Sequence, residues 1–200
     1  MRVLGVDPGT RVVGFGVVDH ERGGFRPITY GAIRARASTH AGRYREIYAG
    51  LREVIEKHAP GEVAVEKVFT GKSPQSALRI GEGRGLALLA AAMSDLPVSE
   101  YAPTLVKKSV VGSGRGSKEQ VQEMVRVLLG LREIPTPNDA SDALAIAICH
   151  CHRRELPGPD LPGRELPGRE LPGRETPGTA RPGTEGRRLD RGPKAASSRS

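Results

Sequence analysis

Four acidic residues, carried by three separate segments, are the side chains best suited to chemistry in this sequence. Asp7 and Glu66 each follow a short apolar run, and Asp139 and Asp142 lie three residues apart further along the chain. Carboxylate oxygens are the ligands that Mg²⁺ prefers in proteins. Two such ions, about 3.5–4 Å apart, can activate water and stabilise a departing oxygen during phosphodiester hydrolysis. The residue types therefore predict a site for two metal ions and a hydrolytic reaction.

The elements that carry the first two acids determine whether they can meet. Residues 3–7 and 62–66 are apolar runs typical of buried strands, so Asp7 and Glu66 lie at the C-terminal ends of two expected strands. Neighbouring strands in a sheet are about 4.8 Å apart. We therefore expect the two carboxylates to emerge at the same edge if these strands pair.

Asp139 and Asp142 belong to a segment that predicts a helix over residues 137–152. Residues three apart share one face of a helix, so both carboxylates point to the same side. The sequence shows no evident cationic partner for the four acids. Their mutual repulsion makes sense if divalent cations occupy the site.

Each acid also has a simpler interpretation when it is taken alone. Asp139, shortly after Thr136 and Pro137, resembles a residue that only starts a helix near the positive end of its dipole. Asp7 could be a turn aspartate before Pro-Gly, and Glu66 could be a solvated glutamate at a strand end. Their joint occurrence at strand ends and on one helix face favours the metal site.

Residues 1–152 predict one α/β domain. Strand hairpins are followed by alternating strands and helices, which implies a mixed five-stranded sheet flanked by helices, because each parallel connection needs a helix to return the chain. The expected strands are 3–7, 12–19, 27–35, 62–66 and 97–101, and the expected helices are 43–58, 74–93, 118–130 and 137–152.

Residues 153–200 have a different composition. Pro, Gly, Arg and Glu dominate, and a five-residue repeat containing Pro-Gly covers residues 155–184. A proline in every unit forbids a continuous helix or strand ladder, and little apolar surface is available for burial. We expect a disordered tail, which is either a solvated linker or a weak, salt-sensitive contact to DNA or a partner through its arginines.

The net charge and the cysteine content indicate which kinds of partner and which cellular compartment to expect. A net charge of +8 and a pI of about 9.9 favour a polyanionic partner, of which nucleic acid is the commonest. The sequence has no leader and no run of about 18 apolar residues, so we expect a cytoplasmic protein without a membrane contact. Cys149 and Cys151 point in different directions on the expected last helix, so we expect no disulfide.

Two further motifs resemble binding signatures, one for a dinucleotide and one for zinc, but neither predicts such a site. Gly81, Gly83 and Gly85 resemble a dinucleotide fingerprint but lie inside an expected helix, where small residues instead permit close approach of another element or a dimer contact. Cys-His-Cys-His at 149–152 lacks the spacing of a zinc site, and we interpret it as a fraying helix end.

Four segments of the chain resemble the RuvC family of crossover junction (Holliday-junction) endodeoxyribonucleases. They are residues 5–18, 65–91, 106–129 and 138–152. The resemblance implies a ribonuclease-H-like fold and a homodimeric endonuclease that requires Mg²⁺, for which Mn²⁺ can substitute. It also implies symmetrical nicks in two strands of like polarity at four-way junction DNA, in homologous recombination and DNA repair, with a branch-migration helicase as a further partner.

The resemblance also implies roles for individual residues. The acidic catalytic and metal-binding residues of the family correspond to Asp7, Glu66, Asp139 and Asp142. Lys107 and Lys118 match basic residues near the scissile phosphates, and Arg115 lies with Lys118 in a Gly/Ser-rich loop suited to closing on phosphate. Phe69 matches an aromatic residue that stacks on an unpaired base. These DNA contacts are expectations from the resemblance.

Three other functions are compatible with parts of the sequence. ATP-binding proteins of the actin and sugar-kinase type also begin with a strand–Asp–Gly–Thr hairpin, but they need two lobes where about 150 residues supply one. A junction-binding protein without activity would lack an acid, and all four acids are present. A ribonuclease-H-like enzyme with another nucleic-acid substrate is the closest alternative, and cleavage of junctions against RNA–DNA hybrids separates the two.

Overall fold

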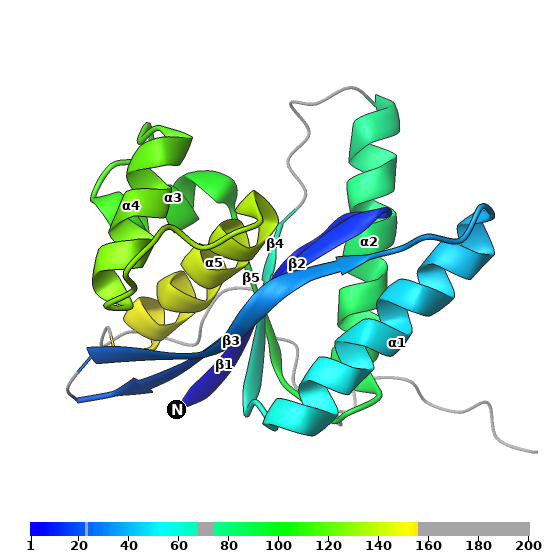
Figure 1. Cartoon of the computed structure of the whole chain (residues 1–200), viewed down its shortest axis with the longest axis horizontal. Coiled ribbons are helices and arrows are strands. Elements are labelled where there is room, and N and C mark those ends of the chain that lie inside the picture. The colour runs from blue at the N-terminus through cyan, green and yellow to red at the C-terminus, as the bar shows by residue number, and fades with distance from the viewer. Residues whose placement is uncertain (23, 68–73, 156–200) are drawn as a thin grey trace, which may run out of the picture. The chain divides into compact units, whose positions relative to one another are not determined.

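The strands form one open, mixed sheet. The computed structural model describes residues 1–22, 24–67 and 74–155, apart from the side chains of 74–76. The strand order is β3-β2-β1-β4-β5 (Figure 1). The strands are β1 (Arg2–Asp7), β2 (Val12–Glu21), β3 (Gly24–Arg34), β4 (Glu62–Glu66) and β5 (Val98–Tyr101). β1, β2 and β3 pair antiparallel, whereas β4 and β5 run parallel to β1, so the predicted mixed five-stranded α/β fold is confirmed.

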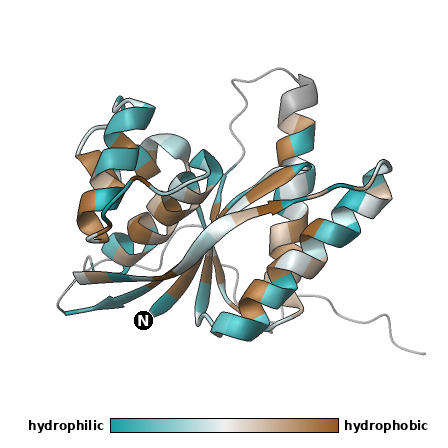
Figure 2. Ribbon diagram, viewed as in Figure 1, coloured by the Kyte–Doolittle hydropathy of each residue, from teal (hydrophilic) through white to brown (hydrophobic). Residues whose placement is uncertain are grey.

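Helices cover both faces of this sheet. In the described part of the chain they are α1 (His40–His58), α2 (Pro74–Ala92), α3 (Pro103–Val111), α4 (Lys118–Leu128) and α5 (Asn138–Glu155). α1 and α2 lie on one face, and α3, α4 and α5 lie on the other (Figure 1). Hydrophobic and hydrophilic residues alternate in bands along α1 and α4 (Figure 2), as in helices with one buried side. None of these helices is long and apolar enough to span a membrane.

Each face of the sheet has its own hydrophobic core. Val3 of β1 packs in the core that contains α3, α4 and α5, whereas Leu4 and Val6 pack in the core that contains α1 and α2. The alternation follows from the two-residue period of a strand, although both faces here are apolar. β1 is therefore fixed from both sides up to Asp7, its last residue.

Helix α3 is the element that the sequence pattern does not predict. It has nine residues, several of them β-branched valines, and its N-cap residue Ala102 makes no side-chain hydrogen bond to the helix. Two signals could have found it: Pro103 occupies the first helical position, and Gly112 ends the helix with a φ of 75°.

The C-terminal part of α5 is not a fraying end, so that prediction is wrong. Residues 149–151 are fully buried, and the helix continues to Glu155. The ring of His150 forms hydrogen bonds with the Tyr101 hydroxyl (2.8 Å) and with a carboxylate oxygen of Glu62 (3.0 Å). These partners lie on β5 and β4 and anchor the helix to the sheet. Residues 156–200, most of the expected tail, lie outside the described residues.

The two cysteines are free, as expected. Burial raises the pKa of the Cys149 thiol to about 11 and that of the Cys151 thiol to about 12. Both side chains therefore stay protonated at neutral pH and act as small apolar groups in the core.

Three glycines let α5 lie directly on β1 and β2. A Cβ atom at Gly5 would be 2.1 Å from the Ala143 carbonyl oxygen, and one at Gly14 would be 2.0 Å from the Asp139 carbonyl oxygen. At Gly16 a Cβ would be 2.7 Å from a methyl carbon of Leu144. Separations under 3.0 Å essentially never occur for real Cβ atoms. The absence of side chains at these positions sets the distance between helix and sheet.

Helix α2 makes a similar close contact at one of the three helical glycines. A Cβ at Gly83 would be 2.5 Å from the carbonyl oxygen of Gly9, in the turn that follows β1, whereas Gly81 and Gly85 have open space around them. The expectation that small residues here permit close approach is therefore confirmed for Gly83.

We predict that Gly5→Ala destabilises the protein because its new methyl group meets the backbone of α5. Overpacking of this kind costs about 1–3 kcal/mol, and each kcal/mol lowers the Tm of a chain of this size by about 2–4 °C. Gly81→Ala is the matched control, since it adds a methyl group in open space within a helix and should stabilise by about 0.5–1 kcal/mol. Thermal unfolding measures both, and equal Tm values for the two variants would contradict the packing argument.

Candidate active site

The four predicted acids line one cavity of about 360 Å³, which we call the acid hollow. Its polar lining consists of Asp7, Glu66, Asp139, Asp142, Lys107 and Lys118. β1 and β4 are neighbouring parallel strands with Val6 opposite Val65, so Asp7 and Glu66 end the two strands side by side. The expected meeting of these two strand ends is confirmed.

The first two turns of α5 bring the other two acids to the same place. Asp139 lies in the first turn of the helix, and its carbonyl oxygen rests over Gly14 of β2, which pairs with Asp7. Asp142 follows three residues later and lines the same hollow. Asp139 thus stands both at a helix start and in the hollow, so the two interpretations of this residue are compatible.

Asp7 is the acid whose ionisation is most disfavoured. Removal from water, followed by the negative charges of Glu66, Asp142 and Asp139, raises the pKa of the Asp7 carboxyl to about 8. The nearby Lys118 charge acts in the opposite direction but is the smallest of these effects. Without a further cation, Asp7 therefore holds a proton at neutral pH.

Lys118 provides a cationic partner that the sequence did not reveal. Its ammonium group donates a hydrogen bond to a carboxylate oxygen of Asp142 at 2.8 Å, and this contact raises the pKa of Lys118. The expectation that none of the acids has a cationic partner is wrong for Asp142. Both side chains remain partly exposed, at 50% for Lys118 and 31% for Asp142, so the pair can separate at little cost.

The residues of the hollow fit a hard divalent cation. The lining offers more carboxylates than ammonium groups, and the acids raise the pKa of Asp7 in the way that a bound cation would reverse. Within the described ranges, no three His, Cys, Asp or Glu side chains form a tight metal-binding group. The acids therefore surround an open hollow, and joint ligation of one ion would require their carboxylates to move closer together.

The second lysine of the hollow ties together the loop beside it. The Lys107 ammonium of α3 donates to the Gly116 carbonyl oxygen at 2.9 Å. The loop then ends in a capping box, in which Ser117 and Gln120 satisfy each other's backbone groups at the start of α4. These contacts hold Lys118, the first residue of α4, at the rim of the hollow.

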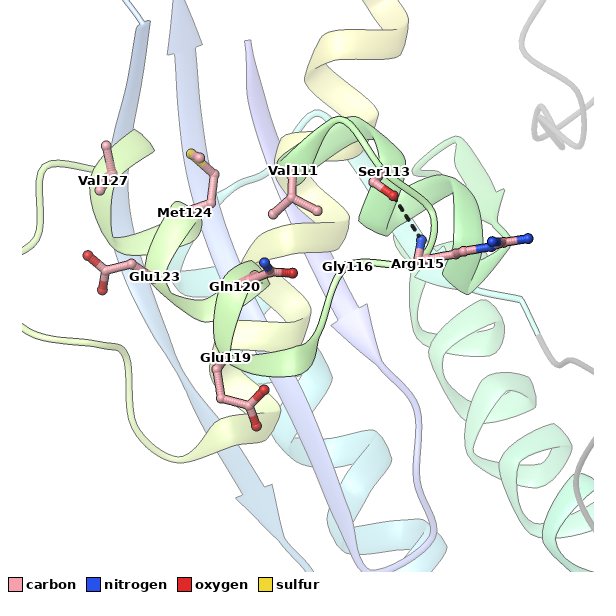
Figure 3. A pocket seen from close by; sticks show the side chains of 9 residues that line it. All are labelled: Val111, Ser113, Arg115, Gly116, Glu119, Gln120, Glu123, Met124 and Val127. Atoms are coloured by element: carbon pink, nitrogen blue, oxygen red, sulfur yellow. Dashed lines mark hydrogen bonds between the residues drawn. The ribbon is translucent and has the colours of Figure 1, made fainter.

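Arg115 does not line the hollow. Arg115 is exposed and lines a different groove, of about 670 Å³, together with Glu119, Glu123 and Met124 of α4 (Figure 3). Phe69 lies outside the described residues. Pro103 of α3, by contrast, lines the hollow and was missed because its helix was not predicted.

The domain that carries this hollow matches a known protein family. Residues 3–150 match the family described as Crossover junction endodeoxyribonuclease RuvC. The chain belongs to the RuvC family.

The alignment with two relatives of this name covers most of the length of each relative. The protein from Caldanaerobacter subterraneus subsp. tengcongensis is 49% identical over 157 residues, which is 78% of this chain and 95% of the relative. The protein from Dehalococcoides mccartyi is 52% identical over 155 residues, or 77% of this chain and 93% of the relative.

Two solved structures of RuvC have the same fold as this chain. Thermus thermophilus RuvC superposes with a TM-score of 0.71 at 36% identity, covering 77% of this chain and 95% of that one. T. thermophilus RuvC in complex with Holliday junction substrate gives a TM-score of 0.70 at 35% identity, with the same coverage. The fold is ribonuclease-H-like, as the resemblance implied.

We predict that Asp7→Asn stabilises the metal-free protein in a pH-dependent way. Between about pH 4 and pH 8 the folded state holds a proton on Asp7 that the unfolded chain has lost, so stability of the original protein falls as the pH rises through this window. Asn carries no charge and removes this loss. Its stabilisation should therefore be absent near pH 4 and reach the order of a few kcal/mol at about pH 9.

Thermal unfolding in EDTA across this pH range tests the prediction. Added Mg²⁺ should narrow the difference at high pH, because a cation among the carboxylates stabilises ionised Asp7. A constant difference between the two proteins at every pH would show that Asp7 is not the group responsible.

Proposed function

We propose that this chain is a structure-specific endonuclease that resolves Holliday junctions by Mg²⁺-dependent phosphodiester hydrolysis. The observation that carries the proposal is the acid hollow, in which four carboxylates and two lysines from β1, β4, α3, α4 and α5 line one cavity. The family and the structure of a relative with a Holliday junction substrate support four-way junction DNA as the substrate. The roles would lie in homologous recombination and DNA repair in the cytoplasm.

The four carboxylates are the residues that would hold the metal. In this proposal Asp7, Glu66, Asp139 and Asp142 bind two Mg²⁺ ions, and Mn²⁺ can replace them. Bound metal would polarise the scissile phosphate, lower the pKa of a water molecule and stabilise the departing oxygen. Asp7 must be ionised to bind metal, so metal binding and loss of its proton are coupled.

The two lysines and the more distant residues would act on DNA. Lys118 can leave Asp142 for a phosphate oxygen, because this exposed ion pair is weak. Lys107 lies in the same lining and would offset phosphate charge. We assign Arg115 to contacts with the DNA backbone outside the hollow, and Phe69 to stacking on an unpaired base at the crossover.

Paired nicks require two active sites, and we propose a homodimer that contacts through α2. This helix and the residue after it expose large apolar side chains at Leu78 (66% exposed), Leu89 (49%) and Met93 (60%). Exposed Gly85 lies on the same stretch of helix. Such a row of apolar and small residues suits a second copy of the chain. Each copy would then nick one of two strands of like polarity, with a branch-migration helicase as a further partner.

We predict that Asp7→Asn abolishes cleavage of a synthetic mobile four-way junction in Mg²⁺ while junction binding in Ca²⁺ survives. The strand remains but the charge that metal binding needs is lost. Asp95→Asn, an exposed residue in the turn after α2, is the matched control and should cleave normally. Turnover by Asp7→Asn near the original rate would refute the metal site. If the original protein cleaves an RNA–DNA hybrid in preference to the junction, its substrate is that of a ribonuclease-H-like enzyme of another kind.

We predict that Leu89→Glu dissociates the dimer, because it places a charge in the proposed apolar contact. Loss of a central contact worth about 1.4 kcal/mol or more raises the dimer Kd at least tenfold. Val127→Glu, at an equally exposed apolar position (55%) on α4, should leave the dimer intact. Sedimentation velocity over a concentration series distinguishes them, and identical dimer constants for both variants would exclude α2 as the interface.

A further inference from the structure

A second polar cavity has a lining whose net charge is opposite to that of the acid hollow. It measures about 340 Å³ and is lined by Thr10, Arg11, Val12, His40, Arg43 and Arg79. We call it the arginine pocket. Three guanidinium groups line it, and its lining includes no carboxylate. Like charges gathered in this way attract an anion, and arginine is especially suited to phosphate.

Arg43 is the pocket residue that the protein holds in a buried, hydrogen-bonded position. Only 6% of the residue is exposed, and one terminal nitrogen donates to the carbonyl oxygens of Ala37 (3.4 Å) and Ser38 (2.8 Å). Its Nε is buried and has no hydrogen-bond partner within the described part of the chain. Burying an unpaired donor on a charged group is costly, so an acceptor on a bound ligand would explain its position.

The start of α1 adds to the positive potential. His40 is the first residue of this helix, Thr39 caps it by accepting from the Gly42 backbone, and its first turn contains no acidic residue. The positive end of the helix dipole is therefore not offset by a carboxylate of that turn. Glu82 of α2 interacts with the Tyr44 hydroxyl of α1, and it is not part of the lining of the arginine pocket.

The position of the pocket relates it to the acid hollow. Asp7 ends β1, and residues 8–11 form the turn that leads into β2. The hollow is lined from the face that carries α3, α4 and α5, whereas the arginine pocket is lined by α1 and α2 on the other face together with Thr10 and Arg11 of this turn. Asp7 of the acid hollow is thus followed directly by the turn that contributes Thr10 and Arg11 to the arginine pocket.

We propose that the arginine pocket binds a backbone phosphate of the junction DNA, a short way along the strand from the phosphate in the acid hollow. The inference rests on the proposed nuclease function and names a second anchoring point for its substrate. A strand that crosses the turn after Asp7 would present one phosphate to the carboxylate site and a later one to Arg11, Arg43 and Arg79. Because phosphate contacts carry no base information, the pocket would set the register of the strand and not its sequence.

The test compares two double variants with the same loss of charge. Arg11→Gln/Arg79→Gln removes two exposed pocket arginines and leaves buried Arg43 in place. Arg36→Gln/Arg45→Gln removes two exposed arginines outside the pocket lining, just before and within α1. Binding of an uncleaved four-way junction in Ca²⁺ is measured over a series of salt concentrations. We expect the pocket variant to reduce the logarithmic salt slope by about 0.9 for each lost phosphate contact, with the control unchanged.

Each outcome decides the inference. An unchanged slope in the pocket variant, or an equal reduction in both variants, overturns it, the second because charge alone would then explain the effect. A purely structural role of the arginines also predicts an unchanged slope. If the original protein fails to bind junctions at all, the proposed function itself fails and the pocket proposal with it. Matching thermal unfolding of all proteins confirms that the variants are folded.

Discussion

The close approach of α5 to β1 and β2 is the constraint on which the candidate active site depends. Glycines at positions 5 and 14 let the backbone of the helix rest on the backbone of the strands, and any side chain there would overlap a carbonyl oxygen. Asp139 carries one of these carbonyls, so the contact that packs the helix also fixes the height of its first acid above the sheet. Core packing and site geometry are therefore one property of the fold, which explains why a methyl group far from solvent would disturb the acids.

The same arrangement makes the site a source of instability. Burial, together with the three other carboxylates of the hollow, raises the pKa of Asp7 to about 8, so the fold opposes the ionisation of this residue. The ion pair between Lys118 and Asp142 relieves only part of the repulsion. This electrostatic conflict lies at the residues proposed to bind metal, where function and stability make opposite demands. A cation would turn these repulsive contacts into attractive ones, which links folding free energy to metal affinity.

Local pattern was enough to predict the strand ends that carry Asp7 and Glu66, because apolar runs and turn residues are adjacent in sequence. It failed where a residue's partner is distant. His150 was taken for part of a fraying end, since polar residues usually mark one, but it is buried because Tyr101 and Glu62, about 49 and 88 positions away, satisfy its ring. The partner of Asp142 was missed for the same reason, as Lys118 precedes it by 24 positions.

Helix α2 connects features that otherwise lie apart. Its Gly83 rests on Gly9 in the turn that follows Asp7, Arg79 lies one turn before on the arginine pocket, and Leu89 lies further along on the exposed apolar row. If α2 moves as a rigid body, a displacement at the apolar row also moves the residues that contact the turn. A second copy bound to α2 would therefore bear on the position of Asp7 without touching the acid hollow. In the proposed dimer, the packing of Gly83 on Gly9 would connect the subunit contact with the position of the active-site residue Asp7.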